Sequence, residues 1–156
     1  PADSDVTANY TIPASSISGF SSYDTSNAYV DNDGGLYTWY TATAGTGTQA
    51  MSSGNTSVSI CPKGWRLPTG GNNGEFNTLY NNYNSSSALR SNPANLTLSG
   101  FMRSSLRVVQ GSRGLYWSST VDSNYYAYSL ILDTSGVDPA RRNDEYAGFS
   151  VRCIAR

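Results

Sequence analysis

The side chains that most often carry catalysis are scarce in this sequence of 156 residues. Histidine is absent, which excludes Ser-His-Asp and Cys-His nucleophilic sites and zinc centres built on imidazole. Lys63 is the only lysine, and nothing in the sequence brings together the only glutamates, Glu75 and Glu145. A two-carboxylate site for glycoside hydrolysis therefore has no signature. We expect no catalytic residue, no bound metal and no cofactor.

Arginine and tyrosine instead gather in the C-terminal part of the chain. Seven of the ten basic residues lie at or beyond Arg103, and tyrosines recur between Tyr116 and Tyr146. Both residue types combine flat apolar area with a polar tip, and both are enriched at the centres of binding interfaces. This concentration indicates a ligand-binding face. The alternative is that tyrosines such as Tyr126 and Tyr128 pack in the core or across strands, while the arginines are only solvated.

The two cysteines, Cys61 and Cys153, have neither C-x-x-C spacing nor other metal ligands nearby. In a secreted chain two cysteines predict one disulfide, whereas in a cytosolic chain they would be buried free thiols. The composition favours secretion, because only 13% of the residues are charged and uncharged polar residues replace them. The net charge of -1 offers no basic field for a nucleic-acid backbone. No apolar run is long enough to cross a membrane.

The length favours a single domain, and one segment has clear helical spacing. The side chains on one face of this predicted helix, over residues 74–83, are Phe76, Leu79, Tyr80 and Tyr83. Thr69, Asn72 or Asn73 could cap the helix, and a further helical turn is expected over residues 86–91. Residues 1–28 have weak periodicity and many polar residues, so we interpret them as an irregular leader or the end of a linker. The predicted domain is then 29–156.

Strand-forming patterns dominate the rest of the chain. Strands are predicted at residues 36–40, 96–98, 105–109, 115–120, 127–132 and 149–154. A long loop is expected over residues 138–144, before the last strand. Two prolines and a glycine make residues 61–69 an extended connector. The expected core residues are Trp65, Leu67, Phe76, Leu79, Trp117, Phe149 and Val151.

Three segments occur together in an order and at separations that resemble one known family. They are Cys61-Pro62-Lys63-Gly64-Trp65-Arg66-Leu67-Pro68-Thr69, Tyr116-Trp117-Ser118-Ser119-Thr120, and Gly148-Phe149-Ser150-Val151-Arg152-Cys153. On these motifs, roughly residues 30–156 resemble the bacterial Fibrobacter succinogenes major paralogous domain family. The resemblance implies an α+β domain with a C-type lectin-like fold, related to the formylglycine-generating type. Such a fold has a small twisted antiparallel sheet, one or two helices and a long loop region.

The same resemblance implies a variable protein of a diversity-generating retroelement. In such proteins a C-terminal segment is mutated at adenine-rich codons, commonly those of Asn, while the scaffold stays fixed. We therefore expect a variable binding face within residues 103–146, at positions that often carry Asn in family members. Its predicted residues are Arg103, Arg107, Val108, Arg113, Leu115, Tyr125, Tyr126, Tyr128, Arg141, Arg142, Asp144 and Tyr146.

The sequence thus predicts a recognition or adhesion domain, secreted or at a bacterial cell surface. Its expected partner is a protein or cell-surface ligand, or a glycan, and neither nucleic-acid binding nor direct membrane insertion is expected. One alternative is a carbohydrate-binding module in which Tyr126 and Tyr128 stack on sugar rings; another is a structural module without a dedicated ligand. Trp117-Ser118-Ser119 stands where calcium-dependent lectins carry Trp-Asn-Asp. Calcium-dependent sugar recognition is therefore not expected.

Overall fold

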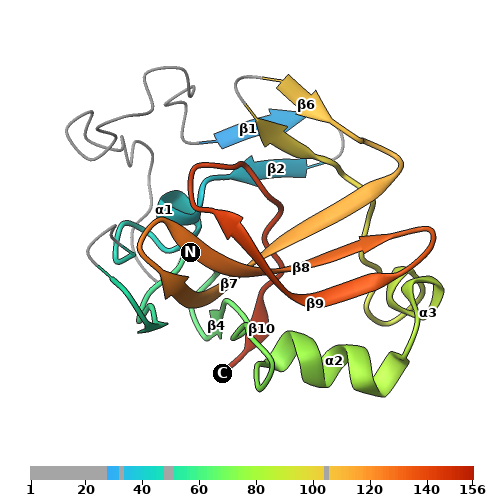
Figure 1. The fold of residues 1–156 in the computed structure, drawn as a ribbon, viewed down its shortest axis with the longest axis horizontal. Helices are drawn as coiled ribbons and strands as arrows, with labels where there is room; N and C mark the ends of the chain where they lie inside the picture. The colour runs from blue at the N-terminus through green and yellow to red at the C-terminus, as the bar shows by residue number, and fades with distance from the viewer. Residues whose placement is uncertain (1–27, 32–33, 48–50, 104–105) are drawn as a thin grey trace.

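The computed structural model describes residues 28–31, 34–47, 51–103 and 106–156, which form an α+β fold with small antiparallel sheets (Figure 1). The predicted leader, residues 1–28, lies almost wholly outside the described residues. The first described elements are β1 (Ala28–Asp31) and β2 (Gly34–Tyr37), which pair antiparallel. The strand predicted at 36–40 ends at Tyr37, because the Thr38 hydroxyl accepts a hydrogen bond from the Thr41 N–H and starts α1 (Trp39–Ala42).

A four-stranded sheet forms the centre of the molecule, in the order β3-β7-β8-β9. Its strands are β3 (Gly54–Asn55), β7 (Arg113–Ser123), β8 (Tyr126–Asp133) and β9 (Val137–Asp144), and all neighbours are antiparallel. The strands predicted at 115–120 and 127–132 are confirmed as parts of β7 and β8. The loop predicted over 138–144 is wrong, because these residues form β9. As an edge strand, β9 tolerates Pro139 and exposed charges that do not alternate as in a half-buried strand.

Two short ribbons complete the β structure. β5 (Phe101–Arg103) pairs with β6 (Leu106–Val108), and β4 (Trp65–Arg66) pairs with β10 (Ile154–Ala155). The strand predicted at 105–109 is thus confirmed as β6. The prediction at 149–154 is only partly correct, since Phe149 and Ser150 form isolated bridges before β10 begins. Residues 96–98 form no strand, because their backbone groups bond to the helix α3, to the Tyr116 hydroxyl and to a turn.

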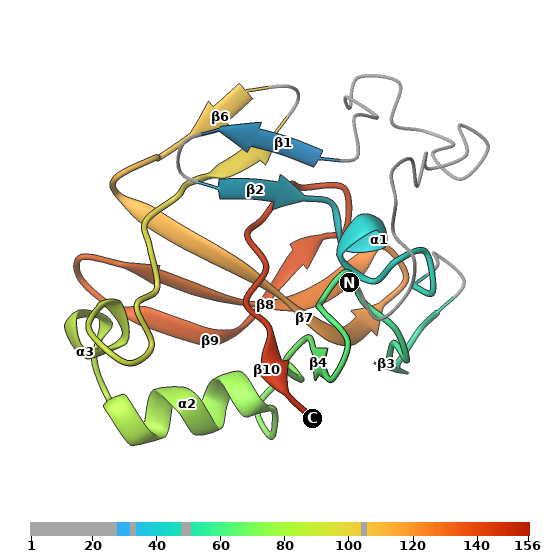
Figure 2. The same ribbon diagram turned by 180° about the vertical axis from the view of Figure 1, so that it is seen from behind.

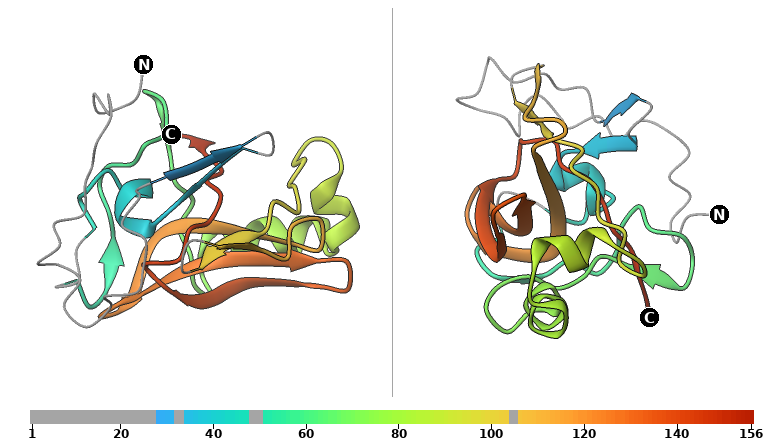
Figure 3. Two further views of the ribbon diagram at one scale, coloured as in Figure 1. Left: turned by 90° about the horizontal axis from the view of Figure 1, so that it is seen from above. Right: turned by 90° about the vertical axis from the view of Figure 1, so that its right-hand side faces the viewer.

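The predicted helices are confirmed as α2 (Glu75–Tyr83) and α3 (Ser86–Arg90). Thr69 takes the expected capping role, because its hydroxyl accepts from the Glu75 N–H at 3.0 Å while Glu75 Oε2 accepts from the Thr69 N–H at 2.9 Å. This reciprocal pair resembles a capping box across a longer loop. Figures 1 and 3 show α2 and α3 together at the end of the molecule away from α1.

Side chains on the two faces of β7 belong to two hydrophobic clusters. Trp117 stacks on Phe149 with ring centroids 4.1 Å apart in one cluster, and Tyr116 packs with Phe76 and Leu130 in the other. Of the predicted core, Leu67, Phe76, Trp117 and Phe149 are buried, and Leu79 and Val151 are half-buried. The prediction that Trp65 lies in the core is wrong. This side chain is 45% exposed, because within the described residues β4 pairs with the two-residue β10 alone, at the rim of the molecule (Figure 2).

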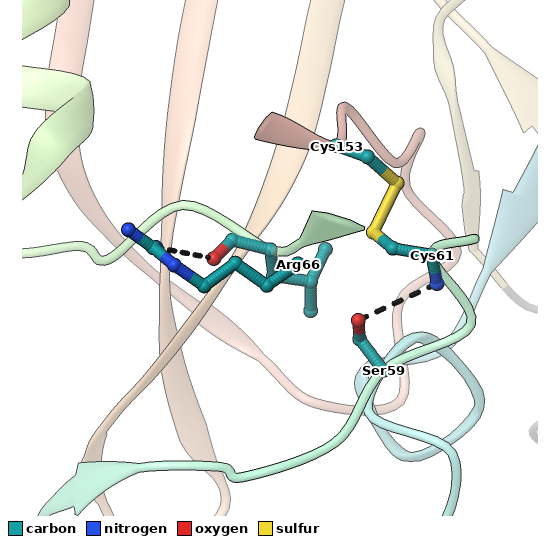
Figure 4. The surroundings of a disulfide bond; sticks show 5 residues. Ser59, Cys61, Arg66 and Cys153 are labelled. Carbon is teal, nitrogen blue, oxygen red and sulfur yellow. Dashed lines mark hydrogen bonds between the residues drawn. A yellow bond between two sulfur atoms is a disulfide. The ribbon is translucent and has the colours of Figure 1, made fainter. Parts of the chain in front are cut away.

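The predicted disulfide is present between Cys61 and Cys153, with Cα atoms 5.8 Å apart. Figure 4 shows it joining the segment before β4 to the segment before β10. The Cys61 N–H donates to the Ser59 hydroxyl, and Arg66 donates to the Leu67 carbonyl. The bond therefore ties the C-terminal segment to the connector that leads into α2. Within the described residues, no helix is both long enough and apolar enough to span a membrane.

Candidate functional site

The predicted ligand-binding residues fall into three groups in the structure. The first group, on the β8–β9 end of the sheet, contains Tyr125, Tyr126, Tyr128, Arg141, Arg142 and Asp144. The second group, near the β5–β6 hairpin and the start of β7, contains Arg103, Arg107, Val108 and Arg113. The third group is buried and contains Leu115 and Tyr146.

The first two groups lie toward opposite ends of the sheet, although Arg141 and Arg142 pair with Ser129 and Tyr128 nearer its middle. Arg113, at the start of β7, is paired with Asp133, whereas Ser123, at the end of β7, is paired with Tyr126. An 11-residue strand that rises about 3.3 Å per residue separates these ends by roughly 30 Å. The residues predicted as one face are therefore divided between two separate surfaces.

The prediction that Leu115 and Tyr146 belong to the binding face is wrong. Leu115 is 2% exposed and Tyr146 is 6% exposed, and both belong to the hydrophobic cluster around Trp117. Leu115 points inward because it shares a strand face with Trp117, two residues along β7. The Tyr146 ring packs against Tyr40, with centroids 5.7 Å apart. Neither side chain can contact a ligand without a rearrangement of the core.

The side chains of the second group, near the β5–β6 hairpin, are less well positioned to bind a ligand. Arg107 Nε donates to the Ser99 carbonyl at 2.8 Å, so this guanidinium is part of the fold. Arg113 pairs with Asp133 at 3.6 Å, and Arg103 is exposed. Val109, which was not among the predicted binding residues, is exposed and has a backbone φ of 52°. A positive φ is a genuine outlier for a β-branched residue.

We call the exposed end of the first group the β8–β9 surface, and define it by Tyr126, Tyr128, Arg141, Arg142 and the neighbouring Asp122 of β7. Arg142 Nε lies 2.6 Å from Asp122 Oδ2, and its guanidinium lies over the Tyr126 ring, 5.4 Å from the centroid. A carboxylate and an aromatic ring thus hold one guanidinium in place. A hydrogen bond to Asp122 raises the pKa of Tyr128, so this phenol stays protonated and oriented.

The loop before α2 packs against this surface and helps to fix Tyr128. A Cβ atom added to Gly70 would lie 2.4 Å from both Tyr128 Cβ and Ser118 Oγ, so only glycine allows this close approach. The Gly70 N–H donates to Thr120 Oγ1 at 2.8 Å, and Ser118 Oγ donates to the Tyr128 carbonyl at 2.7 Å. The surface is therefore built on a backbone whose position is set by bonds from three segments.

A hollow of about 520 Å³ opens at the sheet edge beside Tyr126 and is lined by Asp138, Ala140, Arg141 and Arg142. The Arg141 side chain is 62% exposed and lies 3.9 Å from Asp138. The hollow offers guanidinium donors, a carboxylate and an aromatic face to a polar ligand. Asp122 and Asp138 were missed in the sequence, because the predicted strand ended before Asp122 and Asp138 was assigned to a loop.

Outside this surface, two glutamates have perturbed acidity. Glu75 receives two hydrogen bonds of 2.6 Å from Arg66, which is the main reason that its pKa falls to about 2. Glu145 is completely buried, and burial raises its pKa to about 7. Tyr40 OH donates to Glu145 Oε2 at 2.5 Å, whereas Oε1 has no hydrogen-bond partner among the described residues. Burial first, and then this hydrogen bond, raise the pKa of Tyr40.

The described residues contain no group of three or more acidic, histidine or cysteine side chains that could hold a metal ion. The structure thus defines a disulfide-linked α+β domain with an arginine- and tyrosine-rich sheet edge. Comparison with models of known protein families, with curated proteins and with solved structures found no match.

Proposed function

We propose that this chain is an extracellular recognition domain, secreted or at a bacterial cell surface, and that it is not an enzyme. The observation that carries the proposal is the pre-positioned Arg142, held between Asp122 and Tyr126 on an exposed sheet edge. Side chains that are ordered before binding lose less conformational entropy in a complex. Arginine and tyrosine are also the types that most often dominate binding energy. The disulfide is in keeping with an oxidising compartment.

We further propose a C-type lectin-like fold of the Fibrobacter succinogenes major paralogous domain family, used as a variable protein of a diversity-generating retroelement. The three sequence motifs and the small antiparallel sheets support this proposal. Sequencing the coding region across a natural population tests the retroelement. Substitutions should gather at exposed Tyr126, Arg141 and Arg142, and should spare buried Leu115 and Tyr146. Substitutions spread evenly over exposed and buried positions would contradict diversification.

The proposed partner is a protein or another cell-surface ligand. A glycan is the second candidate, because the Tyr126 ring is 40% exposed and borders the hollow lined by Arg141 and Arg142. An aromatic face beside charged donors suits a sugar ring and its hydroxyls. The two candidates share one surface, so one set of variants tests both.

The test measures binding of the purified domain to a glycan array and to a panel of bacterial surfaces, with calcium and with chelator. The test variant is Arg141→Ala plus Arg142→Ala. A matched control, Lys63→Ala plus Arg90→Ala, removes the same charge from exposed positions outside the β8–β9 surface. Circular dichroism and the melting temperature show whether each variant keeps its fold.

A recognition domain on this surface should lose binding in the test variant and keep it in the control. Binding that needs calcium would contradict the predicted absence of a metal and favour a calcium-dependent lectin. Binding to defined sugars alone would favour the carbohydrate-binding module. Equal binding by both variants would refute the β8–β9 surface, and an absence of binding in every arm would favour a structural module.

A further inference from the structure

Residues of α2 and of the β4–β10 ribbon line a groove of about 470 Å³ that shares no lining residue with the β8–β9 surface. Figure 2 shows where α2, β4 and β10 lie in the fold. The aromatic and apolar lining of the groove includes Trp65, Leu79, Tyr83 and Ile154. Polar lining comes from Glu75, Thr78, Asn82 and Arg152. A second hollow of about 380 Å³ shares Leu96 and Arg152 with this groove, so the two adjoin.

Trp65 is the unusual member of this groove. Trp39 and Trp117 are completely buried and each donates its indole N–H to a backbone carbonyl, at 2.9 Å and 2.8 Å. Trp65 is 45% exposed, and its indole N–H makes no hydrogen bond in the described part of the chain. Its backbone is nevertheless held by β10 and by the nearby disulfide. A large ring presented on a fixed backbone is suited to stacking on a ligand.

The sequence segments that supply this lining contain more basic than acidic residues, and Arg152 is the basic residue that lines the groove itself. Residues 61–96 and 151–156 contain five basic residues and one acidic residue, in a chain whose net charge is -1. The single acid, Glu75, is already bonded by both oxygens to Arg66. Arg152 is exposed and makes no ion pair or hydrogen bond within the described residues. An exposed guanidinium without a carboxylate partner, in a groove whose one carboxylate is already paired, favours an anionic ligand.

We propose that this groove is a second binding site and that its ligand is an acidic saccharide. A sugar ring would stack on Trp65, its carboxylate would pair with Arg152, and its hydroxyls would reach Asn82 and Thr78. The adjoining hollow gives room for a further sugar unit. The phosphates of a single nucleic-acid strand would also pair with the charge of Arg152. Two observations favour the saccharide. The cysteine pair is oxidised, as is typical of extracellular proteins. The exposed tryptophan is a single ring, whereas proteins that bind single strands stack successive bases on several rings.

Oligogalacturonate is the test ligand, with the neutral oligogalactoside and oligothymidylate as comparison ligands. Because the other two tryptophans are buried, acrylamide quenching of tryptophan fluorescence reports chiefly on Trp65. Oligogalacturonate should protect this fluorescence, and its affinity, measured by calorimetry, should fall with added salt. Arg152→Gln should weaken binding about tenfold, as expected for the loss of one charge-assisted bond. Trp65→Ala should weaken the binding of both the acidic and the neutral saccharide.

Both substitutions are at exposed positions, so the variants should keep the melting temperature of the parent. Unprotected Trp65 fluorescence, equal affinity for acidic and neutral saccharides, or unchanged affinity in Trp65→Ala would each overturn the proposal. Tighter binding of oligothymidylate than of oligogalacturonate would show that the ligand of this groove is a nucleic acid and not a saccharide. Arg141→Ala plus Arg142→Ala should leave this binding unchanged. If that variant loses it instead, the saccharide binds at the β8–β9 surface, which supports the proposed function and refutes the second site.

Discussion

The parent protein should lose stability as the pH rises from about 5 to about 7, and Glu145→Gln should abolish this loss. Glu145 is completely buried at the end of the sheet, and no cation bonds to its carboxyl group in the described structure. In the part of the chain that the structure describes, the hydrogen-bond partner of this carboxyl group is the Tyr40 hydroxyl alone. Ionisation would therefore place a negative charge in the core with a single donor beside it.

The sign and size of the effect follow from the pKa of Glu145, which burial raises from its usual 4.5 to about 7. Between these values the folded protein keeps the proton and the unfolded chain releases it, so the free energy of unfolding falls as the pH rises. Below pH 4.5 this contribution is complete, and above pH 7 the loss levels off. At about 1.4 kcal/mol for each pH unit, the loss amounts to about 3 kcal/mol.

Urea unfolding at pH 5, 6, 7 and 8, with the disulfide intact, measures this loss. The absence of histidine keeps the pH window free of imidazole titration. Glutamine keeps an acceptor for the Tyr40 hydroxyl and cannot ionise, so the free energy of unfolding of Glu145→Gln should be nearly constant. Glu75→Gln is the matched control and should retain the parent's fall. Parallel curves for the parent and Glu145→Gln would show that Glu145 is solvated or paired, and would refute the reasoning.

Three further predictions concern stability. Cys153→Ser opens a link across 92 residues and should lower the free energy of unfolding by about 4–5 kcal/mol in urea titrations, whereas an unchanged midpoint would contradict a structural disulfide. Val109→Asn should raise it by about 0.5–1 kcal/mol, because asparagine tolerates the positive φ; a lower melting temperature would show that the valine is not strained. The low pKa of Glu75 stabilises the fold above pH 4.5, and this contribution disappears as the pH falls toward 2. Because the pair is half-exposed, Arg66→Met should remove only about 1 kcal/mol at pH 6, and an equal effect at pH 2 would contradict the pairing.

The elements that could be predicted are those in which a single pattern of apolar residues determines which side chains are buried. The spacing from Phe76 to Tyr83 identified α2, and apolar runs identified β7 and β8. β9 could not be recognised, because an edge strand with Pro139 and adjacent arginines resembles a polar loop. Trp65 and Trp117 show the limit for single residues. Both are tryptophans in strand-like segments, yet one is at the rim and the other in the centre of the core.

The candidate site depends on register, which local sequence does not specify. Register shifts between Trp117 and Val121 in β7, and opposite Ser129 in β8, decide which side chains share a face. By alternation, Tyr128 lies on the same face of β8 as Leu130, which is buried in the cluster with Phe76 of α2. One sheet face therefore contributes to the core where α2 covers it and stays accessible beyond the helix. The proposed recognition surface takes Tyr126, Tyr128 and Arg142 from the uncovered end of that face and Arg141 from the adjoining sheet edge. Its residues could therefore be named from composition but not grouped without the three-dimensional structure.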